Sequence, residues 1–418
     1  MKKLRENINT GYGEEKTMGG KIVLILLCMT AFCIIPAAAL EIAEGPVLIH
    51  ETDLPVHALT TDGRYLVISG DWKNNTLETY HHKEGFTFDG LLLLYDSRTG
   101  TLEKIPGNVP PDYYGAAISD GVLLWTSAPY QFPTNNGNMR QEKAAFQYTV
   151  GEKWPEYAGS PQGRLDGGDN GTFLIITGES NRPELKKMFV YDAAARTAEQ
   201  IPAQNPPAIG KITGDTVVWS ENGNTGDGKI RVYNRSTHET TTIGEDGTYH
   251  GLFDATENTV LHLQSQSKKY NEGPFELRAT SLTTGETHII TDHQVINAKI
   301  DPPIVIWTEK HQNGDDRTYP LYAASLTEAG DPVLISPDAG GAAEVLGNLV
   351  VWSEWNDTTG ITSIRMIRLN IPDMVPEIAA SVPQTLMPET TESGMPPQFI
   401  IGTIAFVLAC LLAVLWRK

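Results

Sequence analysis

The side chains that most often perform catalysis or hold metals are sparse in this chain and do not form known motifs. The chain of 418 residues has three cysteines and ten histidines. Only His81 and His82 are adjacent, and neighbouring side chains generally point apart, so a metal there would need ligands from elsewhere. The motifs G-x-S-x-G, H-E-x-x-H, Walker A and G-x-G-x-x-G after a strand are missing. The sequence therefore predicts no catalytic residue, no metal site and no cofactor.

The cysteines do not change this prediction. All three lie in apolar segments near the chain ends, at Cys28, Cys33 and Cys410. The body of the chain therefore has no disulfide bond, no thiolate metal site and no cysteine nucleophile. Its stability must come from its hydrophobic core alone.

Aromatic residues on two long polar segments are the best candidates for ligand binding. The segments run from Gly70 to Gly90 and from Ser127 to Lys143. Aromatic side chains on long loops are typical of surfaces that contact proteins or carbohydrates. The predicted ligand-binding residues are Trp72, Tyr80, His81, His82, Tyr130, Phe132 and Arg140. The alternative is that the two segments fold onto each other as a lid without a partner.

Four N-x-S/T sequons fall where turns or loops are expected. If the chain is exported, each asparagine is a candidate for N-glycosylation. The four are Asn74, Asn170, Asn234 and Asn356.

The net charge excludes one class of partner. Acidic residues outnumber basic ones by 51 to 32, which gives a formal net charge of -19. A field of this sign repels phosphate backbones and anionic lipid headgroups. We therefore expect no nucleic-acid partner.

An internal repeat indicates the architecture that must position these loops. Val217–Glu221, with the sequence VVWSE, has three clear and three weaker copies, spaced 43 to 57 residues apart. The copies are Leu66–Ser69, Leu123–Thr126, Leu174–Thr177, Val260–Leu263, Val305–Glu309 and Val350–Glu354. A period in the mid-forties is typical of a propeller or a solenoid, and turn signals divide each period into four short strands. The sequence thus predicts an all-β, seven-bladed propeller.

The repeat also predicts how the ring closes and what its core contains. The seventh copy stops after its third strand, Ile364–Leu369, while Pro46–His50 is a spare strand before the first copy. We expect the N-terminal strand to complete the last blade, which leaves no open sheet edge. The tryptophans of the repeat have a fixed place in apolar strands, so we expect them to pack between blades.

The motif in Val217–Glu221, followed by Ile-x-Val-Tyr-x-x-Ser-Thr in Ile230–Thr237, resembles the TolB-like propeller repeats of prokaryotic cell-surface proteins. The resemblance covers residues 45–370 and implies the fold. It supplies no shared catalytic residue, because propellers host enzymes, binding modules and scaffolds alike. The long segments of blades one and two depart from the pattern, as does the lack of tryptophan in blades one, three and five.

The chain ends predict location. Residues 1–39 have the basic, apolar and A-x-A order of a signal peptide, with Met18 as an alternative start. After a propeller at 45–370, residues 371–398 read as a Pro/Thr-rich stalk, 399–416 as one transmembrane helix and 417–418 as a cytoplasmic tail. The basic tail predicts an extracellular head on a single-pass anchor in the cell membrane. A cleaved lipid-anchor or sorting signal is the alternative for the last apolar segment.

Together these features predict a membrane-anchored extracellular propeller that acts as a binding or adhesion module for a protein or glycan. One alternative is an extracellular enzyme acting on glycans, and another is a structural component of the cell envelope. Paired-acid catalysis would require carboxylates that converge about 5–10 Å apart at one mouth of the central channel.

Overall fold

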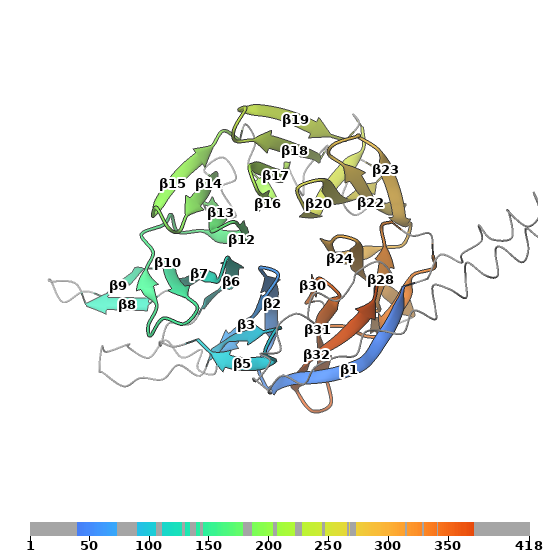
Figure 1. The fold of residues 1–418 in the computed structure, drawn as a ribbon, viewed down its shortest axis with the longest axis horizontal. Helices are drawn as coiled ribbons and strands as arrows, with labels where there is room; N and C mark the ends of the chain where they lie inside the picture. Colours follow the sequence, from blue (N-terminus) through green and yellow to red (C-terminus); the bar gives the residue numbers. More distant parts are fainter. Residues whose placement is uncertain are drawn as a thin grey trace, which may run out of the picture. The chain divides into compact units, whose positions relative to one another are not determined.

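A ring of β-sheets lies within residues 40–371 of the computed structural model (Figure 1). The segments outside the described residues are 1–39, 73–89, 106–110, 128–129, 134–138, 143–144, 179–185, 204–206, 222–227, 245–246, 266, 268–272, 314–315, 328–329, 341 and 372–418. Among the described residues, no helix has the length and apolar character that crossing a membrane requires. The predicted signal peptide and membrane span, and the predicted stalk after Ile371, lie outside this part of the chain and stay predictions.

Seven antiparallel sheets of four strands each surround a central axis, as the repeat predicted (Figure 1). Blade one has β2 (Val56–Thr61), β3 (Tyr65–Trp72), β4 (Gly90–Asp96) and β5 (Thr101–Lys104). Blade two has β6 (Pro111–Ser119), β7 (Val122–Ser127), β10 (Ala145–Thr149) and β11 (Glu156–Tyr157). Blade three has β12 (Arg164–Asp169), β13 (Thr172–Thr177), β14 (Lys187–Asp192) and β15 (Thr197–Ile201).

The next three blades have the same arrangement, in which the first strand lies nearest the axis and the fourth lies outermost. Blade four has β16 (Pro207–Thr213), β17 (Thr216–Glu221), β18 (Lys229–Asn234) and β19 (Glu239–Ile243). Blade five has β20 (Tyr249–Ala255), β21 (Thr259–Ser265), β22 (Phe275–Ser281) and β23 (Thr287–Thr291). Blade six has β24 (Val295–Asp301), β25 (Ile304–Glu309), β28 (Leu321–Ser325) and β29 (Val333–Ser336).

The seventh blade is assembled from both ends of the propeller. It contains β30 (Ala343–Leu346), β31 (Leu349–Asn356), β32 (Ile361–Asn370) and, as its outer strand, β1 (Glu41–Thr52). The register pairs Val47 with Met366 and His50 with Ile364. The predicted closure is therefore confirmed, and β1 is longer than the five-residue strand that the sequence suggested.

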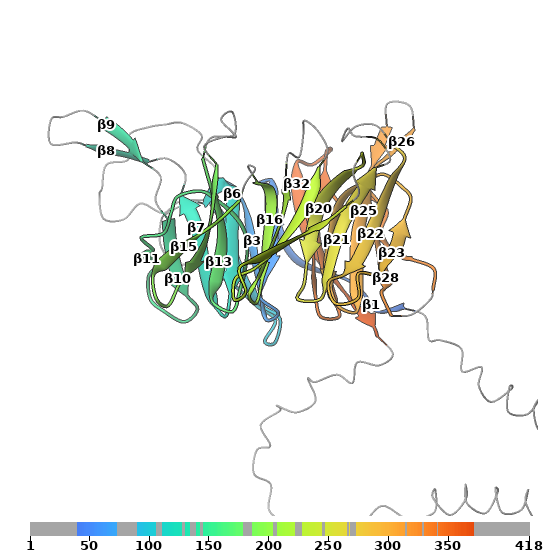
Figure 2. The ribbon, with the colours of Figure 1, turned by 90° about the horizontal axis from the view of Figure 1, so that it is seen from above.

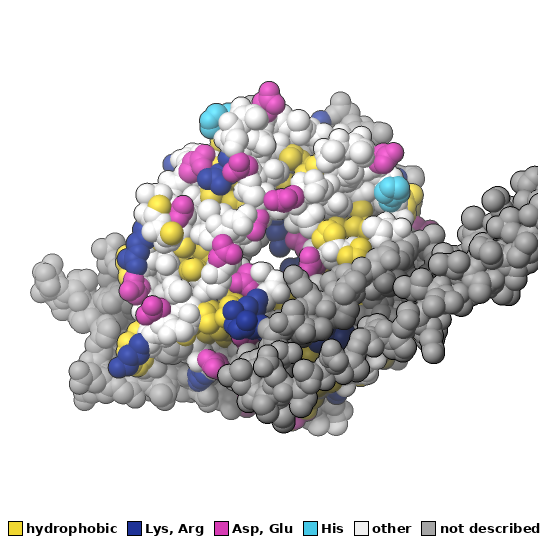
Figure 3. Space-filling model, in the orientation of Figure 1, with side chains coloured by type: hydrophobic (Ala, Val, Ile, Leu, Met, Phe, Trp, Pro, Cys, Tyr) yellow, Lys and Arg dark blue, Asp and Glu magenta, His cyan; other side chains and the backbone are white. Residues whose placement is uncertain are grey.

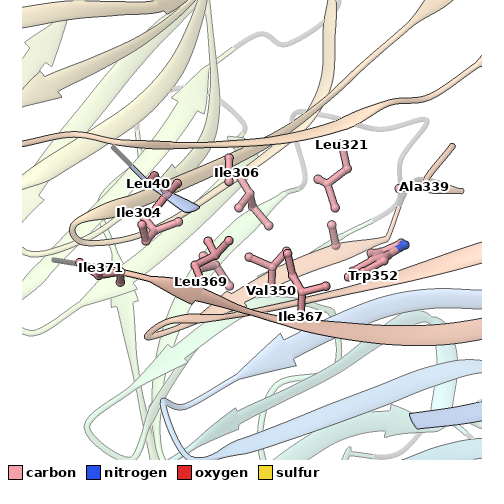
Figure 4. Close-up of a cluster of buried hydrophobic side chains, with 13 residues drawn as sticks. Leu40, Ile304, Ile306, Leu321, Ala339, Val350, Trp352, Ile367, Leu369 and Ile371 are labelled. Carbon is pink, nitrogen blue, oxygen red and sulfur yellow. The ribbon is translucent and has the colours of Figure 1, made fainter. Parts of the chain in front are cut away.

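The core consists of clusters of apolar side chains between neighbouring blades. In the cluster of Figure 4, Ile304 and Ile306 of blade six pack with Val350 and Trp352 of blade seven. Trp125, Trp219 and Trp307 occupy the equivalent place in other clusters, and all four indoles are at most 1% exposed. The prediction that the tryptophans are core residues is confirmed.

Hydrogen bonds join the innermost strands of successive blades. The donor is the backbone N–H of a turn glycine, and the acceptor is a side chain at the end of the preceding blade's first strand. The pairs are Gly121 N to Asp62 Oδ2 (2.8 Å), Gly171 N to Ser119 Oγ (2.8 Å), Gly214 N to Asp169 Oδ2 (2.5 Å) and Gly347 N to Asp301 Oδ2 (2.6 Å). These glycines have φ between 53° and 71°, which favours glycine over residues with a side chain. One residue thus forms the turn and links two blades.

The two faces of the ring differ. Blades two and six each have an added two-stranded ribbon outside the four-stranded sheet, and both ribbons stand on the same face (Figure 2). They are β8 (Tyr130–Pro133) with β9 (Met139–Glu142) and β26 (His311–Asn313) with β27 (Asp316–Thr318). We call this face the loop face. The opposite face, here the hairpin face, carries the turns between the first and second strands. Both ends of the described chain lie there, since Glu41 pairs with Asn370.

Deletion of residues 41–52 tests the closure. Without β1, the backbone groups of β32 face solvent as an open sheet edge, which favours association and weakens the ring. We expect a lower melting temperature by circular dichroism and oligomers in size-exclusion chromatography. Replacing Val47 and Leu48, which are 50% and 47% exposed, by threonine is the control and should change neither. An unchanged monomeric melt of the deletion variant would show that β1 does not latch the ring.

Candidate functional site

A cavity of about 300 Å³ lies at the centre of the ring and opens on the hairpin face. Its walls come from the first strands of the blades and from the turns that follow them. Figure 3 views this face and shows a central hollow with acidic and basic side chains at its rim. Lining residues include Asp62, Asp120, Asp169 and Asp301 at the turns, so the mouth is acidic.

Four charged side chains line one side of the cavity in alternating sign. They are Lys211, Asp254, Lys299 and Glu344, from β16, β20, β24 and β30 of four consecutive blades. Each stands opposite the middle residue of the apolar run in the second strand. In blades one and two the same register position holds Thr60 and Ala117. At this register position, blades four to seven are therefore charged, whereas blades one and two are not.

Each carboxylate of this group is bonded to a lysine. Lys211 Nζ lies 3.1 Å from Asp254 Oδ1, and Lys299 Nζ lies 2.7 Å from Glu344 Oε2. Asp254 also accepts a hydrogen bond from the backbone N–H of Ile300 in the next blade. The four side chains thus connect blades four to seven around the channel.

Burial and neighbouring charge shift the pKa values in this group. Burial opposes the charge of Lys299, but the carboxylates of Glu344 and Asp254 outweigh it and raise the lysine pKa. Burial alone would raise the pKa of Asp254, and Lys211 and Lys299 lower it below its usual value. Burial raises the pKa of Glu344, partly offset by Lys299. Both carboxylates thus have a lysine as counterion.

The predicted ligand-binding residues lie on or next to the loop face as far as they are described. Tyr130 and Phe132 are in β8, and Arg140 is paired with Phe132 across the ribbon from β9. Trp72 ends β3, and the segment that follows it, with Tyr80, His81 and His82, lies outside the described residues. The structure therefore brings together the predicted residues of blade two.

The glycosylation candidates occupy turns or strand ends where they are described. Asn170 is exposed in the turn between β12 and β13, and Asn356 is exposed at the end of β31. Asn234 ends β18 and is partly exposed. Asn74 lies outside the described residues. Modification of these residues stays a prediction.

The sequence search missed two groups of histidines, because each group joins separate segments. His293, Glu309 and His311 place ligand atoms within 4.8 Å of one another at the loop face. Their only sequence signal was a glutamate and a histidine two residues apart. The β26–β27 ribbon beside them was also missed, since blade six has the same period as its neighbours.

The second group is a buried pair in blade five, His250 and His262, with ring centroids 5.5 Å apart. His262 stands where other blades have tryptophan, and its Nε2 lies 2.8 Å from Thr280 Oγ1. Burial lowers the pKa of His250 to about 4. Burial, followed by the charges of His250 and Arg278, lowers the pKa of His262 to about 3.

Comparison with known proteins identifies the fold. No protein-family model matches the chain, and no curated protein matches its sequence. The β-propeller domain of the Trilobed protease from Pyrococcus furiosus superposes with a TM-score of 0.52 and 13% identity, over 75% of this chain and 93% of that one. That domain is described as having an open velcro topology, whereas β1 closes the ring here.

Two enzymes also contain a similar structure. The acylaminoacyl peptidase of Pyrococcus horikoshii has a TM-score of 0.51 and 13% identity, over 72% of this chain and 49% of the peptidase. The oligogalacturonate lyase of Vibrio parahaemolyticus has a TM-score of 0.51 and 10% identity, over 79% of this chain and 96% of the lyase. At such identities the likeness shows the fold alone. The chain has the fold of a seven-bladed β-propeller, as its resemblance to TolB-like repeats implied, and these neighbours share no single activity.

The buried histidines of blade five predict acid sensitivity. A histidine in the unfolded chain has a pKa near 6.5. Below that pH the unfolded chain therefore binds more protons at these two positions than the folded chain does. The contribution of each buried histidine to the free energy of unfolding is fully present above about pH 6.5. It falls towards pH 4 by about 1.4 kcal/mol per pH unit. We expect His262→Phe to lose about half of this dependence in thermal melts between pH 7 and 5, and exposed His288→Ala to lose none. An identical pH slope in His262→Phe would contradict the assignment.

Proposed function

We propose that this chain is a binding or adhesion module of the cell surface, with the loop face as its contact surface for an extracellular protein or glycan. The observation that carries the proposal is the position of the two ribbons. Both β8–β9 and β26–β27 are additions to a blade, and both stand on the loop face (Figure 2). Segments added to a regular scaffold, on one face of it, are the usual place of binding residues.

The position of the chain ends supports the same face. The described chain begins and ends at the hairpin face, where Glu41 pairs with Asn370. If residues 399–416 form the predicted membrane anchor, the chain that leads to it continues from the end of β32 on the hairpin face. The attachment point then lies on the face opposite the two ribbons.

The channel favours a binding role over paired-acid catalysis. Asp254 and Glu344 have lysine partners at 3.1 and 2.7 Å. At the mouth, Asp62, Asp169 and Asp301 each accept a backbone N–H from the next blade. Because these carboxylates already bind a lysine or a backbone N–H of the next blade, we assign them a role in stabilising the ring and not in hydrolysing a glycan. An enzyme acting on glycans and a structural envelope component remain the alternative proposals.

Joint replacement of Trp72, Tyr80, Tyr130 and Phe132 by alanine tests the contact surface. Partners are first identified by presenting the full chain in detergent micelles to a glycan array and to an extract of surface proteins. The variant should then bind at least about 2 kcal/mol more weakly, the scale of an aromatic hot spot, with an unchanged melting temperature.

The control uses aromatic residues of blade two that lie outside the proposed surface. Trp154 and Tyr157 are each 60% exposed, and their joint replacement by alanine should leave affinity unaltered. Equal losses in both variants would mean that binding is not specific to the loop face. A collapsed melt in the first variant would mean that its four rings belong to the core.

A further inference from the structure

A glutamate two residues after the repeat tryptophan recurs in blades four, six and seven, as Glu221, Glu309 and Glu354. In blades six and seven this carboxylate accepts the indole N–H. Trp307 Nε1 lies 2.9 Å from Glu309 Oε1, and Trp352 Nε1 lies 2.7 Å from Glu354 Oε1. A carboxylate near the core is costly to charge unless a cation or donors face it. The group that balances the charge of this glutamate can therefore be compared between the blades.

Blades four and seven provide an arginine as that partner. Arg231 Nε lies 3.0 Å from Glu221 Oε2, and Arg365 Nε lies 2.7 Å from Glu354 Oε2. Both arginines occupy the same register position, directly opposite the tryptophan on the third strand. In these two blades an arginine, which is always charged, permanently balances the charge of the glutamate.

Blade six lacks this arginine. The residue opposite Trp307 is Tyr322, which stacks on the indole with ring centroids 5.7 Å apart. Among the described residues, the groups facing Glu309 Oε2 are two imidazoles. His293 Nδ1 and His311 Nε2 each lie 2.9 Å from this oxygen. Two histidines therefore replace one arginine.

We propose that His293, Glu309 and His311 bind a divalent transition metal of the Zn²⁺ class. One ligand atom of each residue lies within 4.8 Å of the other two, and the contacts of Glu309 Oε2 are with His293 Nδ1 and His311 Nε2. Tetrahedral ligands of zinc at about 2.0–2.1 Å are about 3.3 Å apart, so the 2.9 Å contacts need to open only slightly. The histidine side chains are 64% and 45% exposed and can move, while Glu309 is 3% exposed.

The surroundings hold the carboxylate ready for a metal. Glu309 Oε1 accepts bonds from Trp307 Nε1 and, at 3.3 Å, from Thr291 Oγ1, which leaves Oε2 facing the histidines. Asp292 Oδ1 lies 3.9 Å from His293 Nε2, the ring nitrogen that is not a ligand in this arrangement. At this distance no hydrogen bond forms, but a small rotation of the exposed ring would bring Asp292 to the position from which carboxylates orient ligating histidines in zinc sites.

The ligand set selects the metal class. Two imidazoles and one carboxylate suit zinc, copper, nickel or iron, whereas calcium and magnesium prefer oxygen ligands. Three protein ligands on an exposed face leave at least one coordination position open to water or to an outside group. The inference stands independently of the proposed function, since it needs no partner.

The test titrates Zn²⁺ into the full chain, untagged and in detergent micelles, after EDTA treatment and dialysis. Competition with a chromophoric chelator gives the affinity, and Co²⁺ in place of Zn²⁺ gives the absorption bands of a tetrahedral site. We expect one site per chain, and His293→Ala or His311→Ala to weaken binding by at least about tenfold. Binding should also weaken below about pH 6, because protonated imidazoles cannot ligate.

Two controls separate this site from other histidines. Exposed His288→Ala should leave the Zn²⁺ affinity unchanged. Tyr322→Arg keeps all three ligands but restores the arginine of blades four and seven, and should weaken binding. The absence of a bound Zn²⁺ in the wild-type chain, or equal affinity in the His293→Ala/His311→Ala double variant, would overturn the proposal. The two histidines would then serve only as hydrogen-bond donors to Glu309.

Discussion

Each blade of this protein depends on its neighbours, because a four-stranded sheet with two apolar faces cannot bury both of them alone. Two kinds of contact between neighbouring blades meet this constraint. Large apolar side chains such as Trp125 and Trp352 fill the space between blades, and turn glycines donate backbone N–H groups to the preceding blade near the axis. The contacts between inner strands continue around the whole ring, from β2 through β30 and back to β2. β1 then removes the last open edge by pairing with β32.

The fold was predictable because the constraint recurs in every blade. The repeated apolar run with its tryptophan predicted the blade number, and the missing strand after Ile364–Leu369 predicted the closure that is observed. The charges of the channel had a sequence signal that was not used. Lys211, Asp254, Lys299 and Glu344 share one register position in four consecutive repeats. An alignment of the repeats by strand register would have revealed them.

The histidine groups could not be predicted in the same way, because they depend on contacts that no repeat encodes. His293 lies in the connection between blades five and six, and it meets Glu309 only when the two blades pack. His262 replaces a tryptophan in the core, and its low pKa results from burial that the sequence does not reveal. Both groups are departures from the repeat. Such departures concern single blades, so they leave the ring intact while changing local chemistry.

The two faces of the ring differ in how many of their polar groups serve the fold. On the hairpin face, acidic side chains are bonded to lysines or to the backbone of the next blade. On the loop face, the β8–β9 and β26–β27 ribbons add to the blades without closing the ring. The central claim is that partners contact the loop face. Photocrosslinking on cells that express the full chain tests it most directly, with p-benzoylphenylalanine at Gln131 or Gln312 on the loop-face ribbons and at Glu257 or Thr284 in hairpin-face turns. Adducts from the first pair and none from the second are predicted, and adducts from the hairpin face alone would contradict the claim.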